Sequence, residues 1–118
     1  MNKKKVLIID DEIDLCLLLK SYFLRKDYEV YLAHTLEQGI DFLDNIKPDV
    51  LFLDNNLPDG TGWTEAPALA GKYPDMYINL ISAFHPAKPL MPDNAKYTVI
   101  EKPMSFGDLD RQIAAMTG

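Results

Sequence analysis

Short apolar blocks of strand length alternate with blocks of helical periodicity along the whole of this 118-residue chain. The blocks Lys4–Asp10 and Val50–Asp54 are nearly continuous in valine, leucine, isoleucine and phenylalanine, as expected for central strands buried on both faces. The block Tyr28–Ala33 alternates more, as an edge strand does. Two more strand-length blocks, Tyr77–Ile81 and Thr98–Glu101, follow. This alternation predicts five βα units and a parallel sheet.

Three helices are predicted from apolar stripes that would face the sheet. The second begins with a capping box of Thr35 and Gln38 and ends before Pro48, and the last begins with a box of Ser105 and Asp108. The inward residues are Leu15, Leu18, Leu19, Tyr22 and Phe23 in the first helix, Leu36, Ile40 and Leu43 in the second, and Phe106, Leu109, Ile113 and Met116 in the last.

Prolines shape the other two helical segments. A third helix is predicted from Gly62 to Tyr73, with Pro67 near its start and Pro74 after its end. The segment His85–Lys96 has prolines at positions 86, 89 and 92 and almost no apolar stripe. A proline inside a helix costs about 3 kcal/mol, so we expect the fourth helix to be short or irregular.

Length, charge and cysteine content limit the classes of protein to which this chain can belong. The length fits one domain over residues 1–118, either stand-alone or the excised first domain of a longer protein. A net charge of -6 argues against direct nucleic-acid binding, and the run Lys3–Lys5 is interpreted as a solvated flank. Cys16 permits no intramolecular disulfide and is expected to pack in the core. No apolar run approaches the length of a membrane span, so we expect a soluble, cytoplasmic protein without membrane contact.

Polar residues follow four of the predicted strands at the point where each strand ends. They are Asp10 and Asp11 after the first strand, Asp54, Ser82 and Lys102 after three others. The carboxyl ends of parallel strands meet at one edge of the sheet, which is where such folds bind their ligands. Three carboxylates, a hydroxyl and an ammonium group are therefore expected to converge.

This set of groups suits a metal-dependent reaction at phosphorus. Three clustered aspartates repel one another, which raises their pKa values unless a cation compensates. Oxygen ligands favour Mg²⁺, and the absence of histidine or cysteine from the cluster argues against zinc. With the metal present an aspartate is a competent nucleophile toward phosphorus, and the hydroxyl and ammonium groups can hold the phosphoryl oxygens.

The same residues fit the motifs of a known family. They are Asp-Asp-Glu at 10–12, Asp54 followed by Leu57-Pro58 and Gly62, Ser82-Ala83, and Lys102-Pro103. The chain resembles, over essentially its full length, a response-regulator receiver domain of two-component signal transduction. The resemblance implies a single doubly wound (βα)5 domain with a flavodoxin-like fold and the parallel strand order 2-1-3-4-5.

The resemblance also implies roles for the site residues. Asp54 would accept a phosphoryl group from a phosphohistidine on a sensor histidine kinase or a phosphotransfer protein, while Ser82 and Lys102 would hold the phosphoryl oxygens. Such a domain catalyses only its own phosphorylation and dephosphorylation, and signals to a downstream protein or an attached output domain. Mg²⁺ would be bound by Asp10 (partly through water), by the side chains of Asp11 and Asp54, and by the backbone carbonyl of Asn56.

The chain departs from the family at its output face. The family has Tyr or Phe three residues before the lysine, where this chain has Val99, with Tyr97 two residues earlier. Together with the proline-rich segment, this leaves open signalling through another surface or a relay of phosphate without a large switch. Phe84, two residues after Ser82, would shield the site or pack.

Three other functions remain as alternatives. The first is a receiver-like interaction domain with a reduced or absent phosphorylation switch. The second is a metal-dependent phosphohydrolase, for which the chain offers no substrate pocket, general acid or cap. The third is a nucleotide-binding flavodoxin-like protein, against which the acidic loop after the first strand argues, since a phosphate cradle needs glycine and backbone amides.

Single residues also have purely structural interpretations. Asp10 and Asp11 could cap a helix, and Lys102 could be a surface charge. The lone histidines His34 and His85 are expected in surface or capping positions, because neither has a second ligand nearby in the sequence.

Overall fold

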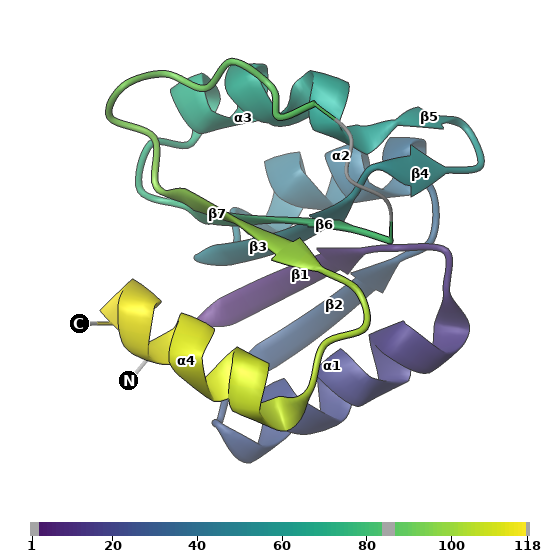
Figure 1. The fold of residues 1–118 in the computed structure, drawn as a ribbon, viewed down its shortest axis with the longest axis vertical. Coiled ribbons are helices and arrows are strands. Elements are labelled where there is room, and N and C mark those ends of the chain that lie inside the picture. Colours follow the sequence, from purple (N-terminus) through teal and green to yellow (C-terminus); the bar gives the residue numbers. More distant parts are fainter. Residues whose placement is uncertain (1–2, 84–86, 118) are drawn as a thin grey trace.

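Five parallel strands form the central sheet of the computed structural model, which describes residues 3–83 and 87–117 (Figure 1). Their lateral order is β2-β1-β3-β6-β7, which is the predicted order 2-1-3-4-5 with β6 and β7 as the fourth and fifth strands. The strands are β1 (Lys5–Ile9), β2 (Glu29–Ala33), β3 (Val50–Asp54), β6 (Tyr77–Ser82) and β7 (Tyr97–Glu101).

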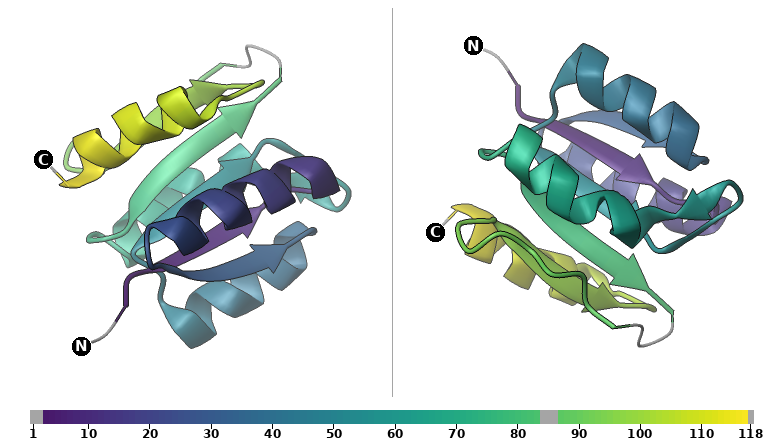
Figure 2. Two further views of the ribbon diagram at one scale, coloured as in Figure 1. Left: turned by 90° about the horizontal axis from the view of Figure 1, so that it is seen from below. Right: turned by 90° about the horizontal axis from the view of Figure 1, so that it is seen from above.

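The helices lie on both faces of this sheet. Figure 2 shows α1 and α4 over one face and α2 and α3 over the other, so that the sheet is covered twice. The helices are α1 (Ile13–Arg25), α2 (Leu36–Ile46), a 3-10 turn η1 (Gly62–Glu65) that leads into α3 (Ala66–Lys72), and α4 (Phe106–Thr117). None of the described helices has both the length and the hydrophobicity needed to cross a bilayer.

The alternation of side chains along the strands divides the core into two layers. Leu7 and Leu51 pack with α2 and α3, whereas Val6 and Phe52 pack with α1 and α4. Strands β1 and β3 are buried on both faces, as their continuous apolar sequences predict. Cys16 is a residue of α1 and is fully buried, which confirms its predicted place in the core.

The predicted helix starts are formed with one difference. At α4 the box is complete, since Ser105 N–H donates to Asp108 (2.8 Å) and Asp108 N–H donates to the Ser105 hydroxyl (3.2 Å). At α2 the Thr35 hydroxyl accepts from Gln38 N–H at 3.1 Å. The Gln38 side chain, however, accepts from the N–H of His34 rather than that of Thr35, at 3.0 Å. The cap therefore reaches one residue further back than a standard box.

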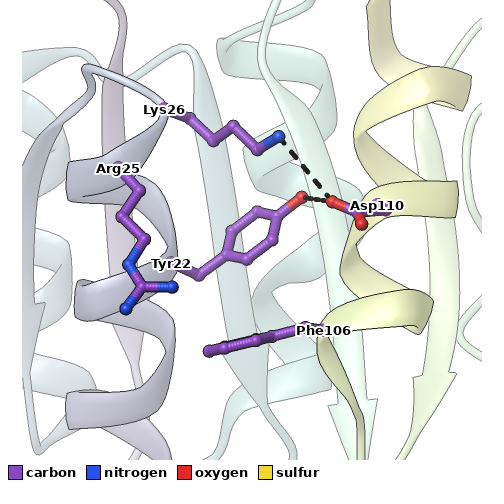
Figure 3. Close-up of a pocket in the computed structure, with 5 residues that line it drawn as sticks. All are labelled: Tyr22, Arg25, Lys26, Phe106 and Asp110. Atoms are coloured by element: carbon purple, nitrogen blue, oxygen red, sulfur yellow. Dashed lines mark hydrogen bonds and ion pairs between the residues drawn. The ribbon is translucent and has the colours of Figure 1, made fainter.

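The expected inward place of Phe106 is wrong, because its side chain is 40% exposed where α1 and α4 meet. Figure 3 shows its ring beside Tyr22, between the two helices. Its ring lies at the interface between α1 and α4, with its centroid 5.7 Å from that of Tyr22. The Tyr22 hydroxyl donates to Asp110 at 2.5 Å, and the Lys26 ammonium lies 3.8 Å from the same carboxylate. A buried tyrosine and its hydrogen bond thus join the two helices, and the partly exposed ring of Phe106 lies beside them.

The segment before β7 replaces a helix with an irregular strap. Residues 87–96 contain no helix, and they run on the α3 side of the sheet (Figure 1). Met91 and Ala95 of this segment pack against the core. Leu90 points away and is 93% exposed. The prolines therefore suppress the fourth helix over these residues. The expectations for Phe84 and His85 lie outside the described residues.

The third helical segment also differs in detail from the prediction of one helix from Gly62 to Tyr73. Its first turn is the 3-10 turn η1, and the α-helix begins only at Ala66. Pro67 occupies the first turn of α3, where its missing N–H costs no intrahelical hydrogen bond.

Candidate functional site

The predicted polar residues meet at the carboxyl edge of the sheet, around a small pocket of about 100 Å³. The strand ends of β1, β3 and β6 and the residues after β7 supply its walls, as the parallel topology requires. The lining residues are Asp11, Glu12, Asp54, Asn56, Ser82, Ala83 and Lys102.

Three aspartates form the acidic side of the pocket. Asp10 is fully buried and Asp54 is 3% exposed, whereas Asp11 is exposed at the rim. One carboxylate oxygen from each lies within 4.8 Å of the others. Two hydrogen bonds hold the chain here: Asp10 N–H donates to the carbonyl of Ala33 at 3.0 Å, and the side-chain oxygen Oδ1 of Asp10 accepts from Glu12 N–H at 2.8 Å.

Lys102 supplies the positive charge of the site, and its peptide bond to Pro103 is cis. Its ammonium lies 2.9 Å from Asp10 Oδ2, 3.2 Å from Asp54 Oδ1 and 2.6 Å from Glu12 Oε1. Burial by itself lowers the pKa of Lys102, but the bonds to Glu12 and Asp10 and the charge of Asp54 outweigh it and hold the pKa above its usual range. The ammonium therefore remains charged.

One ammonium does not neutralise this cluster. Burial, and then the charge of Asp10, raise the pKa of Asp54 to about 6. Burial also raises the pKa of Asp10. Asp10 Oδ2 is fully enclosed, and among the described residues it has an ion pair with Lys102 but no well-aligned hydrogen bond. The site thus favours additional positive charge.

These residues fit a hard divalent cation. The donors are carboxylate oxygens close enough to share one ion, and the fully enclosed Oδ2 of Asp10 has only its ion pair with Lys102. Burial and mutual repulsion disfavour the ionised state of Asp54 without a cation. Such a cation would restore the ordinary acidity of Asp54.

Asn56 approaches the pocket on a short hairpin that follows β3. The hairpin consists of β4 (Asn56–Leu57) and β5 (Gly60–Thr61). Its base is fixed at Asn55, whose N–H donates to Ile81 O at 3.2 Å and whose carbonyl accepts from Gly62 N–H at 3.0 Å. Gly62 is required here, because a Cβ at this position would lie 2.1 Å from the carbonyl oxygen of Asp54.

Ser82 ends β6 and is 6% exposed within the pocket wall. On the neighbouring strand β7, Val99 is partly buried and packs against the core, whereas Tyr97 is 36% exposed at the strand's beginning. Tyr97 and Val99 thus lie at different depths on β7.

Two residues take part in the site in ways that the sequence analysis did not assign. Glu12 pairs with Lys102 at the rim, and the only sequence signal was its place in the acidic run. His34 is half-buried, and its Nδ1 lies 3.0 Å from the carbonyl oxygen of Asp10. Since a carbonyl oxygen only accepts hydrogen bonds, Nδ1 of His34 carries the proton and donates it to the backbone of Asp10.

A family model described as the response regulator receiver domain matches residues 6–114. The transcriptional regulatory protein YxdJ of Bacillus subtilis is 30% identical over 104 residues, covering 86% of this chain and 45% of the relative. Sporulation initiation phosphotransferase F of the same organism is 31% identical over 62 residues, covering 52% of this chain and 50% of the relative. The matches thus span half of these relatives or less.

Solved structures share the fold. A CheY-like response regulator receiver domain protein from Methanospirillum hungatei superposes with a TM-score of 0.83 at 23% identity, covering 97% of this chain and 93% of that one. The response regulator TrrA from Thermotoga maritima, solved in complex with Mg²⁺-BeF, superposes with a TM-score of 0.81 at 25% identity, covering 96% of this chain and 98% of that one.

Proposed function

This chain belongs to the response-regulator receiver domain family, and on that premise we propose that it accepts a phosphoryl group on Asp54 in a Mg²⁺-dependent reaction. The observation that carries this proposal is the position of Asp54, buried at the end of β3, 3.2 Å from the Lys102 ammonium and beside two further carboxylates. A nucleophile, a fixed cation and a set of metal ligands share one small pocket.

The reaction transfers a phosphoryl group from a phosphohistidine. An ionised oxygen of Asp54 attacks the phosphorus, forming the P–O bond of an acyl phosphate. The P–N bond of the donor breaks, and its electron pair stays on the imidazole nitrogen, which takes a proton from solvent. Because the pKa of Asp54 is about 6, the nucleophilic form predominates at neutral pH.

The other site residues bind and orient. Asp10, Asp11 and Asp54 and the Asn56 carbonyl would hold Mg²⁺, which when bound supplies positive charge to the transferring group. Lys102 remains charged and can bind one phosphoryl oxygen, and the Ser82 hydroxyl can donate to another.

The donor and the reader of this modification are other proteins or domains. A sensor histidine kinase or a phosphotransfer protein would supply the phosphoryl group, and a downstream protein or an output domain would read it. The family to which the chain belongs supports this assignment. In this proposal the domain signals and acts on no substrate besides its own Asp54.

Intact mass after incubation with acetyl phosphate or phosphoramidate tests the proposal. We expect a gain of one phosphoryl group that requires Mg²⁺, is labile to alkali and disappears in Asp54→Asn. Asp41→Asn, an exposed carboxylate on α2, is the matched control and should be modified like the wild type. If no adduct forms and beryllofluoride with Mg²⁺ does not bind either, Asp54 is not a phosphoacceptor.

A second candidate is an interaction domain that does not depend on phosphate. It is favoured by Val99 in place of an aromatic residue and by the irregular strap over residues 87–96. This candidate requires that partner binding be the same for the wild type, Asp54→Asn and the beryllofluoride complex. A partner affinity that changes with beryllofluoride would exclude it.

A further inference from the structure

Asp59 connects the hairpin beside the pocket to a helix that lies well before it in the sequence. Its two carboxylate oxygens accept hydrogen bonds from the backbone N–H groups of Leu36 at 2.7 Å and Glu37 at 2.9 Å. These are the first two residues of α2, whose N–H groups have no partner within the helix. The carboxylate thus caps α2 from another part of the chain, and these bonds lower the pKa of Asp59.

The hairpin that carries Asp59 also carries Asn56. Asn56 pairs with Thr61 and Leu57 pairs with Gly60, which leaves Pro58 and Asp59 as the turn. A two-stranded ladder of this length is not stable by itself. Its position therefore depends on how its two ends are attached to the domain.

One end of the hairpin is fixed by the core. Leu57 is buried among core residues, and the Asn55 backbone is bonded to β6. The turn is fixed by Asp59, assisted by a close approach of the Leu36 side chain to Gly60, where a Cβ would lie 3.3 Å from Leu36 Cδ2. Without Asp59, the turn would lose both of its hydrogen bonds to α2.

The segment that leads into α2 is itself held to the acidic cluster by a hydrogen bond. His34, two residues before the helix, donates from Nδ1 to the carbonyl of Asp10, and its own N–H donates to Gln38 in the first turn. The acidic cluster, the start of α2 and the hairpin therefore form one closed set of contacts around the pocket.

We propose that Asp59 is a positioning residue that holds the hairpin, and with it the backbone carbonyl of Asn56, at the distance from the three aspartates that divalent-cation binding requires. This inference rests on the proposed function of the pocket. It assigns a role in metal affinity to a residue that does not line the pocket, and it predicts that the chemistry at Asp54 is unchanged once the cation is bound.

Calorimetric titration with Mg²⁺ tests the inference in wild type, Asp59→Ala and Asp59→Asn. Residues that orient a metal ligand typically change metal affinity by about 10- to 100-fold. We expect the Kd for Mg²⁺ to rise by about tenfold in Asp59→Ala, and by less in Asp59→Asn, which keeps one acceptor oxygen. Glu37→Gln is the matched control, because it removes one negative charge from the same helix end and leaves both hydrogen bonds of Asp59 in place.

The rate of phosphorylation by acetyl phosphate separates positioning from general damage. With Asp59→Ala the Mg²⁺ concentration for half-maximal rate should rise with the Kd, while the rate at saturating Mg²⁺ should equal that of the wild type. A merely structural role would lower the saturating rate as well. If Asp59→Ala does not fold, Asp59→Asn gives the same comparison.

The outcomes are distinct. An unchanged Kd in Asp59→Ala, or an equal rise in Glu37→Gln, overturns the positioning role and leaves the proposed function intact. A wild type that binds no Mg²⁺ overturns the proposed function, and the inference with it.

Discussion

The buried carboxyl of Asp54 should make the metal-free protein less stable as the pH rises, the reverse of the usual effect of a carboxyl group in a folded protein. Its pKa is raised by burial and by the charge of Asp10, so the folded state favours the protonated form. Between about pH 4 and about pH 6 the folded protein then holds more protons at this site than the unfolded chain does, and the contribution of Asp54 to the free energy of unfolding falls as the pH rises.

The size of this contribution follows from the two pKa values. The pKa of Asp54 rises from 3.8 to about 6 on folding, which at about 1.4 kcal/mol per pH unit corresponds to a loss of about 3 kcal/mol at pH 7. Other carboxylates act in the opposite direction, since hydrogen bonds lower the pKa values of Asp59 and Asp108. The effect must therefore be measured as a difference from a variant that lacks only the Asp54 charge.

Urea denaturation of wild type and Asp54→Asn in EDTA, followed by the fluorescence of the buried Trp63, gives that difference. We expect the two proteins to be similar near pH 4 and Asp54→Asn to become more stable by up to about 3 kcal/mol by pH 7. Mg²⁺ at a hundredfold excess over its Kd should stabilise the wild type by about 2.7 kcal/mol, and should stabilise the variant less. Asp41→Asn, which removes an exposed carboxylate of α2, is the control for the loss of one negative charge.

A stability difference between wild type and Asp54→Asn that stays constant from pH 4 to pH 7 would refute the reasoning. So would a wild type that gains stability relative to the variant as the pH rises, because that result would mean that Lys102 alone compensates the charge of Asp54.

Three further predictions concern the interface between α1 and α4 and the glycine beside the site, Gly62. Tyr22→Phe removes the donor to Asp110 and should lower the free energy of unfolding in urea by about 1 kcal/mol; an unchanged value would contradict this. Burial, and then the bond to Asp110, raise the pKa of Tyr22 above its ordinary value of 10.0, so the wild type should lose stability above about pH 10 more steeply than Tyr22→Phe. Parallel alkaline profiles would exclude this. Gly62→Ala should lower the free energy of unfolding by at least about 2 kcal/mol, because the added Cβ would meet the carbonyl of Asp54. Gly71→Ala, whose Cβ would have nothing within 4 Å, should leave the stability unchanged or raise it. Equal thermal stabilities of the two variants would contradict the steric argument.

The part of the fold that depends on local sequence was predictable. Strand blocks, helix stripes and the cap of Ser105 and Asp108 are properties of residues close together in the chain, so periodicity and capping chemistry identify them. The positions of Asp10, Asp54 and Lys102 at one edge followed from parallel topology, because every strand end of such a sheet lies on the same side.

Only the tertiary structure decided how side chains from distant segments meet. Phe106 fits the apolar stripe of α4, yet the rotation of that helix against α1 leaves it exposed at their interface. Glu12 reaches Lys102 across 90 residues, and Asp59 reaches the start of α2 across 22 and 23 residues. Such contacts depend on strand register and loop path, which are set by packing of the whole domain and have no periodic signature. The sequence by itself therefore determined which groups lie at the carboxyl edge of the sheet. The packing of the domain determined which of these groups are in contact, because residues far apart in the chain become neighbours only when the sheet has formed.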